Sequence, residues 1–561
     1  MGGSMIDDWA EIGRGLDVKV YFCGDDIKHQ PVRPSAIIFY PIDDGWNDFK
    51  YRCRYRYRVY FGERREGIEG HVFLGFVSDH EKIDRSGRIS QKIDLVEADE
   101  LPDFFTMQGG MGDYRRIVSE HGIEMSRRLL LAFNDLVVSK GVAKRTRLVN
   151  EAIKTKVFSL AFMRDAERFF SFHNAESVLN GLEEESFSKI STQLSLSYKL
   201  SGFPQNHNFR LDFETDSLLP KRICVLIGRN GLGKSQALNA IARSLILGDE
   251  RFSDRGNGRP MISRLLAIAT PGETGNTFPA ERANRRIKYR RLMLNRSARA
   301  KPSRGFGDLC VQLARSEEPI GKNDRWSLFE ESIQFFSNID KVVLPLSKDL
   351  SVKGGHVSEI KGKLYVPLLS LRRGSEQTIL EIQGAVVNNA TPVFYIDGDI
   401  YPLSSGQLTF IKFIVQACLF VENGTLVLLD EPETHLHPNF ISEFVRILNR
   451  LLRYTGSVAV IATHSAYFVR EVPRGQVLVF KREVDGHVSI QNPRLKTFGA
   501  DVGTISYFVF EDEITNGLVE DILERFPQAP EDRFFLLKEL EEELSADVVM
   551  YLRRKLNMEQ K

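Results

Sequence analysis

Short apolar runs in the second half of the chain predict the strands of a buried sheet. Four such runs are Ile223–Ile227, Ile262–Ala269, Thr425–Leu429 and Val458–Ala462. Runs of this kind are typical of parallel strands that are covered on both faces. The stretch after the first run repeats its apolar residues at helical spacing, so a helix is expected to follow that strand directly. Alternating strands and helices predict the α/β class.

A different pattern marks the N-terminal region. Residues 16–80 alternate between apolar and polar positions, most clearly in Tyr51–Phe61, where tyrosine, cysteine, valine and phenylalanine fall on one face. The other face carries arginine at positions 52, 54, 56 and 58. Four arginines in a row could contact a phosphate backbone. The simpler interpretation, which we favour, is the solvated outer face of an antiparallel sheet, with charge that guards against edge pairing.

Helical spacing begins after Gly112. Helices are predicted over roughly 112–140, 145–172 and 174–184, so residues 5–188 form an α+β region, and this region carries no catalytic motif. Two strands with a turn near Pro204 are predicted over 192–214. Near the C-terminus, a hairpin is predicted at 476–491 and an acidic helical tail at 531–556.

Composition narrows the class of protein. The chain has 561 residues, and its 76 basic and 75 acidic residues leave no global field that would favour nucleic acid or a membrane. Five cysteines without paired spacing suit a reducing cytosol and argue against a zinc site. No apolar run approaches the length of a membrane span, so we expect a cytoplasmic protein. Residues 1–4 are interpreted as a cloning scar.

The clearest chemical signal follows the first apolar run. Residues 228–235 fit the pattern G-x-x-x-x-G-K-[ST], between a predicted strand and a predicted helix. In that context glycine N–H groups and the helix N-terminus cradle phosphates. Lys234 is expected to reach the β- and γ-phosphates of ATP, and Ser235 to bind Mg²⁺. The predicted ATP-binding residues are Gly228, Arg229, Asn230, Gly231, Leu232, Gly233, Lys234, Ser235 and Gln236.

Two further predicted strands end in reactive side chains. Asp430 and Glu431 follow the run Thr425–Leu429, and His464 follows Val458–Ala462. Ligands bind at the carboxyl ends of parallel strands. We therefore expect Asp430 to hold the Mg²⁺ shell, Glu431 to polarise the attacking water and His464 to sense the γ-phosphate.

A second small-residue loop precedes an apolar helix at Leu403–Gln407. A serine here is a natural N-cap, and a helix N-terminus of this kind is a candidate anion site, although such caps are common.

A strongly basic segment lies between the predicted strands Ile262–Ala269 and Thr425–Leu429. From Arg282 to Arg304 there are ten basic residues and no acidic one, with apolar residues interleaved so that part of it is a candidate strand. The segment is interpreted either as a solvated loop or as a contact for nucleic acid or an acidic partner, and neither interpretation is preferred. The residues expected to make such a contact are Arg285, Arg286, Arg290 and Arg291.

Four motifs in this order, GRNGLGKS, LSSGQ, LVLLDEPE and ATHS, resemble an ABC-type ATPase over roughly 192–511. The resemblance implies an ABC-type P-loop domain with a mixed sheet and a helical lobe, followed by a C-terminal tail over 512–561. It identifies Lys234 and Ser235 with the Walker A pair, Asp430 with Walker B, Glu431 with the catalytic glutamate and His464 with the switch histidine. The signature loop is Ser404, Ser405, Gly406 and Gln407, in which Ser405 replaces a glycine. No glutamine can be matched to the Q-loop.

The phrases DEPETHLHP and THSAYFVREV are similar to the overcoming-lysogenization-defect (OLD) family and to stand-alone ATPases of bacterial antiphage systems, such as PtuA of Septu and of some retrons. This resemblance implies an ATP-hydrolysing sensor subunit that controls an HNH-type partner nuclease. No TOPRIM nuclease pattern follows His464. DNA or a retron reverse transcriptase–msDNA complex is a further candidate partner. The alternatives are a soluble RecF-like DNA-repair ATPase and an ATP-locked scaffold with negligible turnover.

The motif count also predicts an assembly. The chain has one Walker A loop and one signature loop, and in the ABC arrangement the signature of one subunit covers the ATP held by another. We therefore expect a homodimer or a higher even oligomer.

Overall fold

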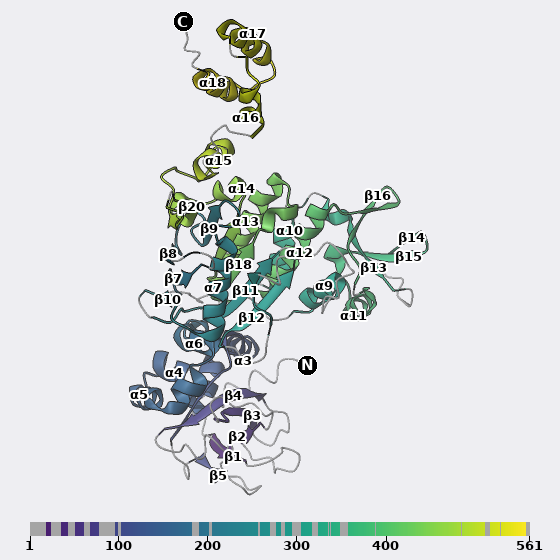
Figure 1. The fold of residues 1–561 in the computed structure, drawn as a ribbon. Helices are drawn as coiled ribbons and strands as arrows, with labels where there is room; N and C mark the ends of the chain where they lie inside the picture. The colour runs from purple at the N-terminus through teal and green to yellow at the C-terminus, as the bar shows by residue number, and fades with distance from the viewer. Residues whose placement is uncertain are drawn as a thin grey trace.

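The computed structural model shows three sheets and the helices around them, with a fourth, small sheet beside the P-loop (Figure 1). It describes residues 18–23, 35–42, 51–60, 68–77, 96–98, 103–181, 190–200, 203, 205–255, 258–269, 277–281, 286–293, 305–316, 324–334, 336, 338–347, 357–387, 389–483, 485–510, 517–527 and 529–556. None of the helices in these ranges combines the length and the apolar character needed to span a membrane.

The central sheet has seven strands in the order β12-β11-β18-β19-β9-β20-β21, and every neighbouring pair is parallel except β20–β21. This arrangement confirms the predicted α/β class with a mixed sheet. The four predicted buried runs are all strands of it, and the predicted C-terminal hairpin forms its far edge. The strands are β9 (Ile223–Gly228), β11 (Arg264–Ala269), β12 (Lys288–Met293), β18 (Thr425–Asp430), β19 (Val458–Thr463), β20 (Val477–Arg482) and β21 (Val488–Gln491).

Both faces of this sheet are covered, which explains the uninterrupted apolar character of its strands. In β9, Ile223, Val225 and Ile227 join a core with α12 (Ser405–Phe420) and α13 (Pro438–Thr455). Cys224 and Leu226 face the other way, into a core with α7 (Lys234–Leu247). That second core is closed by a small antiparallel sheet of β7 (Gln193–Lys199), β8 (Asn206–Asp212) and β10 (Phe252–Asp254).

A helical lobe extends from the β12 side of the sheet, to the right in Figure 1. It contains α9 (Phe306–Ala314), α10 (Arg325–Ile333) and α11 (Glu376–Ala385), and α12 packs against α9 and α10. A five-stranded sheet lies at its outer end, in the order β14-β15-β13-β16-β17. Its strands are β13 (Val342–Leu346), β14 (Ser358–Ile360), β15 (Lys363–Pro367), β16 (Val393–Ile396) and β17 (Asp399–Pro402).

The N-terminal sheet has the order β5-β1-β2-β3-β4-β6. The predicted alternation is confirmed in β3, since Tyr55 and Tyr57 are buried while Arg56 is exposed. The expected role of the arginines in guarding an edge is wrong, because β3 lies inside the sheet and pairs antiparallel with both β2 and β4. The sheet as a whole is mixed, since β1 pairs parallel with β2. The strands are β1 (Lys19–Phe22), β2 (Ala36–Pro41), β3 (Arg54–Tyr60), β4 (Ile68–Phe76), β5 (Val96–Glu97) and β6 (Phe104–Met107).

The helices after this sheet are shorter than predicted. The helix expected over 112–140 is α3 (Met111–Ala132) and α4 (Leu136–Gly141), separated at Asn134, whose φ is +52°, and at Asp135, which caps α4. The helix expected over 145–172 is divided into α5 (Thr146–Lys154), a π-helical turn (Phe158–Phe162) and α6 (Ala166–Asn174). Over 174–184 only the 3-10 turn Val178–Asn180 forms, and 182–189 lie outside the described residues.

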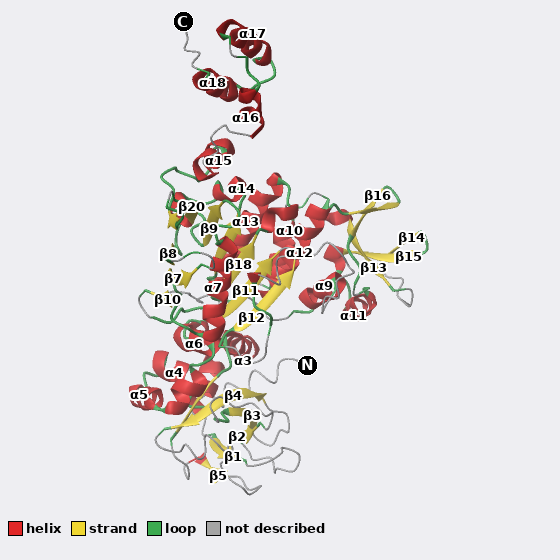
Figure 2. Ribbon diagram, in the orientation of Figure 1, coloured by secondary structure: helices red, strands yellow, loops and turns green. Residues whose placement is uncertain are grey.

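The C-terminal tail is helical, as predicted. Beyond α14 (Ala466–Val469) and α15 (Val502–Phe510) lie α16 (Gly517–Glu524), α17 (Pro530–Leu540) and α18 (Ala546–Lys555), drawn in red at the top of Figure 2. Val519, Phe526, Leu537 and Leu552 form a small core of their own. This tail therefore packs chiefly on itself.

Candidate functional site

The P-loop connects the end of β9 to the start of α7, as its sequence predicts, and its glycines are required by its shape. Gly231 and Gly233 have φ of +81° and +92°, a region that disfavours other residues. Gly228 has φ of +157°, and a Cβ there would lie 2.4 Å from the carbonyl oxygen of Phe480. Arg229, Asn230 and Gln236 are exposed, while Leu232 is buried. The loop thus presents its backbone to solvent at a helix N-terminus, which fits an anion such as a nucleotide phosphate.

The Lys234 side chain is buried and lies over this loop. Its Nζ donates hydrogen bonds to the carbonyl oxygens of Gly228 at 2.8 Å and Arg229 at 3.2 Å. The ammonium group is therefore held at the mouth of the loop by neutral acceptors.

Asp430 connects the carboxyl end of β18 to the P-loop through a hydrogen bond. It is the last residue of β18 and is 1% exposed. Its Oδ1 accepts a hydrogen bond from Ser235 Oγ at 2.9 Å, and its Oδ2 accepts one from Thr277 Oγ1 at 2.7 Å. The structure brings together the two residues predicted to hold Mg²⁺, and a hydroxyl and a carboxylate are oxygen ligands of the kind that Mg²⁺ takes.

Thr277 is a site residue that the sequence analysis missed. It lies in the connection between β11 and β12, where the sequence offers no glutamine for a Q-loop, and it is 5% exposed. Asn239 of α7 fixes this residue by donating from Nδ2 to the Thr277 carbonyl oxygen at 2.6 Å. No motif surrounds Thr277, so no local signal in the sequence could have identified it.

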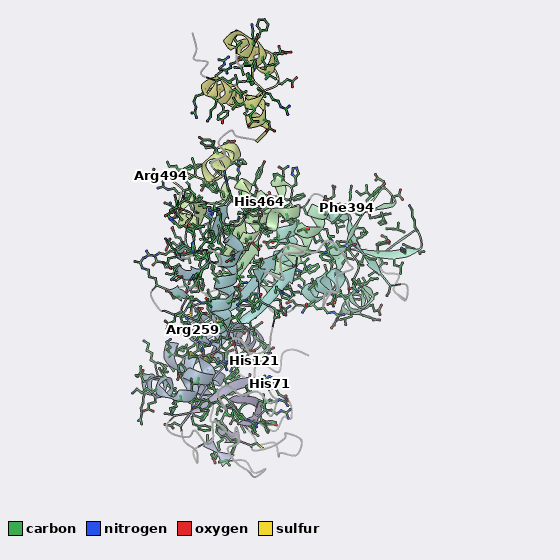
Figure 3. All side chains as sticks on the ribbon, in the orientation of Figure 1. His71, His121, Arg259, Phe394, His464 and Arg494 are labelled. Atoms are coloured by element: carbon green, nitrogen blue, oxygen red, sulfur yellow. The ribbon has the colours of Figure 1, made fainter. Side chains whose placement is uncertain are left out.

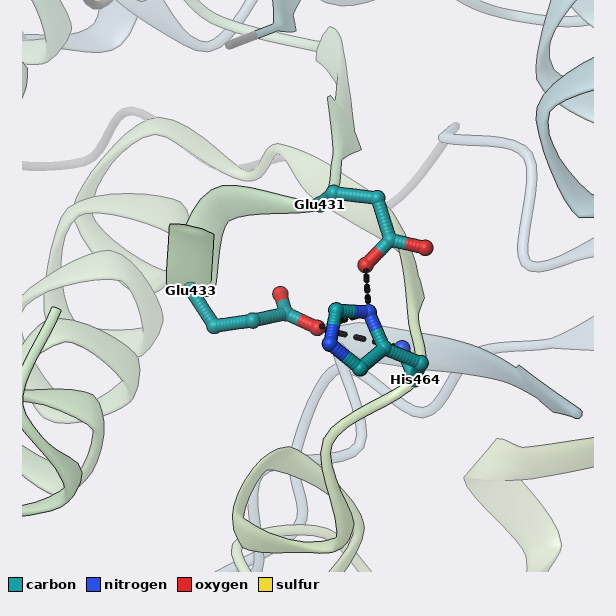
Figure 4. A group of neighbouring side chains, drawn as sticks. All are labelled: Glu431, Glu433 and His464. Carbon is teal, nitrogen blue, oxygen red and sulfur yellow. Dashed lines mark hydrogen bonds and ion pairs between the residues drawn. The ribbon is translucent and has the colours of Figure 1, made fainter. Parts of the chain in front are cut away.

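Glu431, which follows Asp430 in the chain, meets His464, as Figure 4 shows. Glu431 has φ of +48°, an unusual conformation for a residue with a side chain, and its amide donates to the Ala462 carbonyl oxygen at 2.9 Å. Its carboxylate hydrogen-bonds Nδ1 of His464. The residues predicted to polarise water and to sense the γ-phosphate are therefore in direct contact.

Glu433 is the second residue that the sequence analysis missed. Its Oε1 accepts from the Thr463 hydroxyl and, at 3.1 Å, from the His464 amide, and it lies 3.3 Å from His464 Nδ1. Its side chain is 7% exposed, and Oε2 has no hydrogen-bond partner. Burial, and then the charge of Glu431, raises the pKa of Glu433 to about 7. Oxygen and nitrogen atoms of Glu431, Glu433 and His464 lie within 4.8 Å of one another.

The predicted signature loop begins α12 in the helical lobe. Ser404 is the N-cap, and its Oγ accepts from the Gln407 amide at 3.3 Å while Gln407 Oε1 accepts from the Ser404 amide at 2.9 Å. Ser404 is exposed, Ser405 half-buried and Gly406 buried. This capping box fixes the loop shape, and the loop is carried by elements other than those of the P-loop.

The basic segment is partly a strand. Its described residues are 286–293, of which Lys288–Met293 form β12 at the edge of the central sheet, whereas Arg285 lies outside the described residues. Arg286 Nη1 donates to the Gly248 carbonyl oxygen at 3.3 Å, and Arg291 Nη1 to that of Phe278 at 3.2 Å. The guanidinium of Arg290 stacks on the Phe420 ring at 4.1 Å. These three arginines thus have partners within the chain.

Comparisons with known proteins agree with this geometry. Residues 399–470, which include the signature loop, Asp430 and His464, match the family described as "AAA domain, putative AbiEii toxin, Type IV TA system". This stretch of the chain is therefore similar to an AAA-type ATPase domain. The P-loop lies outside the matched residues and is identified from its own sequence and geometry.

Among individual proteins, the chain is 27% identical over 492 residues to Protein ea59 of Escherichia phage lambda, which covers 84% of this chain and 86% of that protein. UvrA2 from Deinococcus radiodurans superposes over 60% of this chain with a TM-score of 0.27 and 15% identity, and the aligned part is 43% of the UvrA2 chain. An ABC transporter in an inward-facing conformation superposes over 54% of this chain and 84% of its own, with a TM-score of 0.25 and 14% identity.

Proposed function

We propose that the protein is an ATP-hydrolysing sensor subunit of a bacterial antiphage defence complex and controls a partner nuclease. The observation that carries the ATPase part is the convergence of Lys234, Asp430, Glu431 and His464 at one edge of a parallel sheet, next to a glycine loop. Ligands bind at this edge in α/β sheets.

Each of these side chains has a use in phosphoryl transfer. Lys234 offers its positive charge to the β- and γ-phosphates, and Ser235 and Asp430 offer oxygen ligands to Mg²⁺. When bound, the ion supplies charge neutralisation. Glu431 accepts a hydrogen bond from the attacking water and polarises it. His464, which contacts both Glu431 and Glu433, is held near that water by two carboxylates.

The positions of the two loops support an assembly of subunits. The P-loop belongs to the central sheet, and the Ser404–Gln407 loop begins a helix of the lateral lobe. We infer that a second subunit supplies the signature loop to each nucleotide, in a symmetric homodimer or a higher even oligomer. ATP then closes the dimer, since the γ-phosphate bridges the two halves.

The defence role rests on the similarity to OLD and PtuA-type ATPases. A relative encoded by a phage, which matches most of its own length, agrees with a role in conflicts between phages and bacteria. The tail also offers apolar surface for a nuclease of the HNH type, since Phe534, Phe535 and Met550 are 61%, 81% and 70% exposed.

A plaque assay tests the complete proposal. The chain is expressed with the genes adjacent to it in a phage-sensitive host, and the efficiency of plating is measured for wild type and for Lys234→Ala and Glu431→Gln. We expect the wild type to lower plating by at least about tenfold and both variants to lose this protection, because ATP binding and turnover are each required. Equal plating with and without the wild-type genes, over a panel of phages, contradicts the defence role and leaves the ATPase role intact.

A further inference from the structure

A cavity of about 680 Å³ lies at the junction of the N-terminal helices, the central sheet and the helical lobe. Its wall is formed by α9, the start of α10, the end of α12 and the first residue of β11. The residues used below are Arg264, Asp308, Arg315, Arg325, Phe420 and Glu422. A volume of this size is ordinary for a small-molecule site.

The cavity lies at the opposite edge of the sheet from the P-loop. Arg264 is the first residue of β11, and it pairs in register with Thr425, the first residue of β18. Asp430 is the last residue of that six-residue strand, so about 17 Å of strand separates the cavity edge from the nucleotide edge. In Figure 3, His464 marks the nucleotide edge and Arg259, near α6, marks the opposite one.

Positive charge exceeds negative charge beside this cavity. Glu422 forms ion pairs with Arg325, with Arg115 at 3.7 Å and with Arg264 at 3.9 Å. Glu167 pairs with Lys288 at 2.5 Å and with Arg264 at 3.5 Å. Among the residues that line the cavity, Arg264, Arg315 and Arg325 outnumber the carboxylates of Asp308 and Glu422. Buried charges are stable when they are paired, so this cluster has capacity for a further anion.

The cations differ in how firmly they are held. Arg325 is 2% exposed, and its Nη1 donates to the carbonyl oxygens of Cys418 and Val421 at 2.9 and 3.0 Å, which fixes it as a cap of α12. Arg264 approaches its carboxylates only at 3.5 and 3.9 Å, beyond good hydrogen-bond distance. Arg315 is exposed in the wall and donates from Nε to the neutral Gln383 Oε1 at 2.8 Å. Arg264 and Arg315 can thus turn toward a ligand.

The ring of Phe420 adds a second element of recognition. It lines the cavity, and the guanidinium of Arg290 from β12 lies over it at 4.1 Å. The described part of the basic segment therefore reaches this cavity through Arg290. Guanidinium groups bind phosphate in a bidentate manner, and an aromatic ring with a stacked arginine suits a base next to it.

We propose that this cavity binds a phosphorylated ligand, a free nucleotide or the phosphorylated end of a nucleic acid strand, between Arg264 of β11 and Arg315, the C-cap residue of α9. The site is separate from the P-loop and does not depend on ATP turnover. It lies at the C-terminal end of α12, whose N-terminus carries the signature loop, and the 16 residues of that helix span about 24 Å. A ligand here contacts the helix that carries Ser405 and Gly406.

Direct binding to the full chain tests the site, in a Lys234→Ala background that keeps the P-loop from competing. The probes are AMP, measured by calorimetry, and a 3′-fluorescein hexathymidylate with a 5′-phosphate, measured by anisotropy. Arg315→Glu and Arg264→Gln remove cavity cations. Arg373→Glu, on an exposed position of the same lobe, makes the same charge change as Arg315→Glu outside the cavity.

We expect at least one probe to bind to the parent protein. Arg315→Glu and Arg264→Gln should each weaken the affinity for that probe by at least about tenfold, and Arg373→Glu should leave it unchanged. That affinity should fall with added salt, as phosphate contacts require. Binding of AMP assigns the site to a free nucleotide, and binding of the oligonucleotide alone assigns it to a nucleic acid end. If neither probe binds, or if both cavity variants bind as tightly as the parent, the cluster is a structural junction and the proposal is overturned. Unchanged melting temperatures show that the variants are folded.

Discussion

Ser235 Oγ donates a hydrogen bond to Asp430 Oδ1 at 2.9 Å, although 195 positions separate the two residues in the chain. The contact exists because β9 and β18 both flank β19, so their carboxyl ends are two strands apart at one edge of the sheet. A hydroxyl from the P-loop and a carboxylate from the next acidic strand end are thereby oriented before any ligand arrives. Such preorganisation is what phosphoryl transfer requires of a protein.

Thr277 should support this pair. Thr277→Val keeps the side-chain shape and removes the hydrogen bond of 2.7 Å to Asp430, a charged acceptor. Such a bond is worth about 1.5–3 kcal/mol, so we expect the Mg²⁺ concentration for half-maximal phosphate release to rise about tenfold. Thr497→Val is the control, because Thr497 is also buried and hydrogen-bonded, to the Val472 carbonyl oxygen, away from the site. Equal Mg²⁺ dependence in wild type and Thr277→Val contradicts this role.

Substitutions at Lys234 and at Glu431 should separate nucleotide binding from hydrolysis. Lys234→Ala removes the main cation at the phosphates, and we expect nucleotide affinity to fall about ten- to a hundredfold. Glu431→Gln preserves the shape of the side chain but is a poor base, so affinity should persist while phosphate release falls about a hundredfold or more. Glu376→Gln, at the exposed first residue of α11, is the matched control for removal of a carboxylate. Normal turnover in Glu431→Gln would remove its catalytic assignment.

Glu433 should make stability depend on pH. Its folded-state pKa is about 7, above the ordinary value of 4.5, because burial and then the charge of Glu431 oppose ionisation more strongly than the hydrogen bond from Thr463 favours it. The folded state therefore binds more protons than the unfolded state between these pH values. The contribution of Glu433 is fully present below about pH 4.5, falls as pH rises toward 7 and is lost above it. Glu433→Gln cannot ionise and should remove this loss.

The measurement is the free energy of unfolding of wild type and Glu433→Gln from pH 5 to 8. The difference between the two proteins isolates Glu433 from other shifted groups such as Asp135, whose pKa burial also raises to about 7. We expect the variant to gain relative to wild type as pH rises, by up to about 3 kcal/mol. A difference that stays constant over this range shows that Glu433 is not protonated in the folded protein.

The site was predictable where chemistry follows a strand end, and not elsewhere. Lys234, Asp430 and His464 each follow an apolar run, so the pattern alone placed them at one edge of a sheet. Thr277 and Glu433 reach the same edge through tertiary contacts. The neighbours of Thr277 in the sequence give no sign of its contacts, and the motif LVLLDEPE contains Glu433 without indicating its contacts with Thr463 and His464. The same limit explains the divided helix at Asn134 and Asp135, because Asp135 is fully buried and its capping role depends on the packing around it.

The final prediction concerns the shared site. If the signature loop of one subunit covers the nucleotide of another, Ser404 acts across an interface, but it also caps its own helix. Replacement by arginine would confound these two roles. Ser404→Asp retains a good N-cap and places a negative charge where a γ-phosphate is expected, so folding should be preserved and hydrolysis lost. Ser404→Thr keeps both the cap and the hydroxyl and should remain active.

Mixing two inactive variants then tests whether subunits share the nucleotide site. Lys234→Ala chains retain an intact signature loop, and Ser404→Asp chains retain an intact P-loop. Each mixed dimer therefore contains one complete site. Random pairing makes half of the dimers mixed, so we expect phosphate release to recover to about one quarter of the wild-type rate. Differently tagged chains, captured in sequence, establish that mixed dimers form. If captured mixed dimers are as inactive as each parent, neither subunit completes the site of the other. The nucleotide must then be hydrolysed by residues of the chain that binds it.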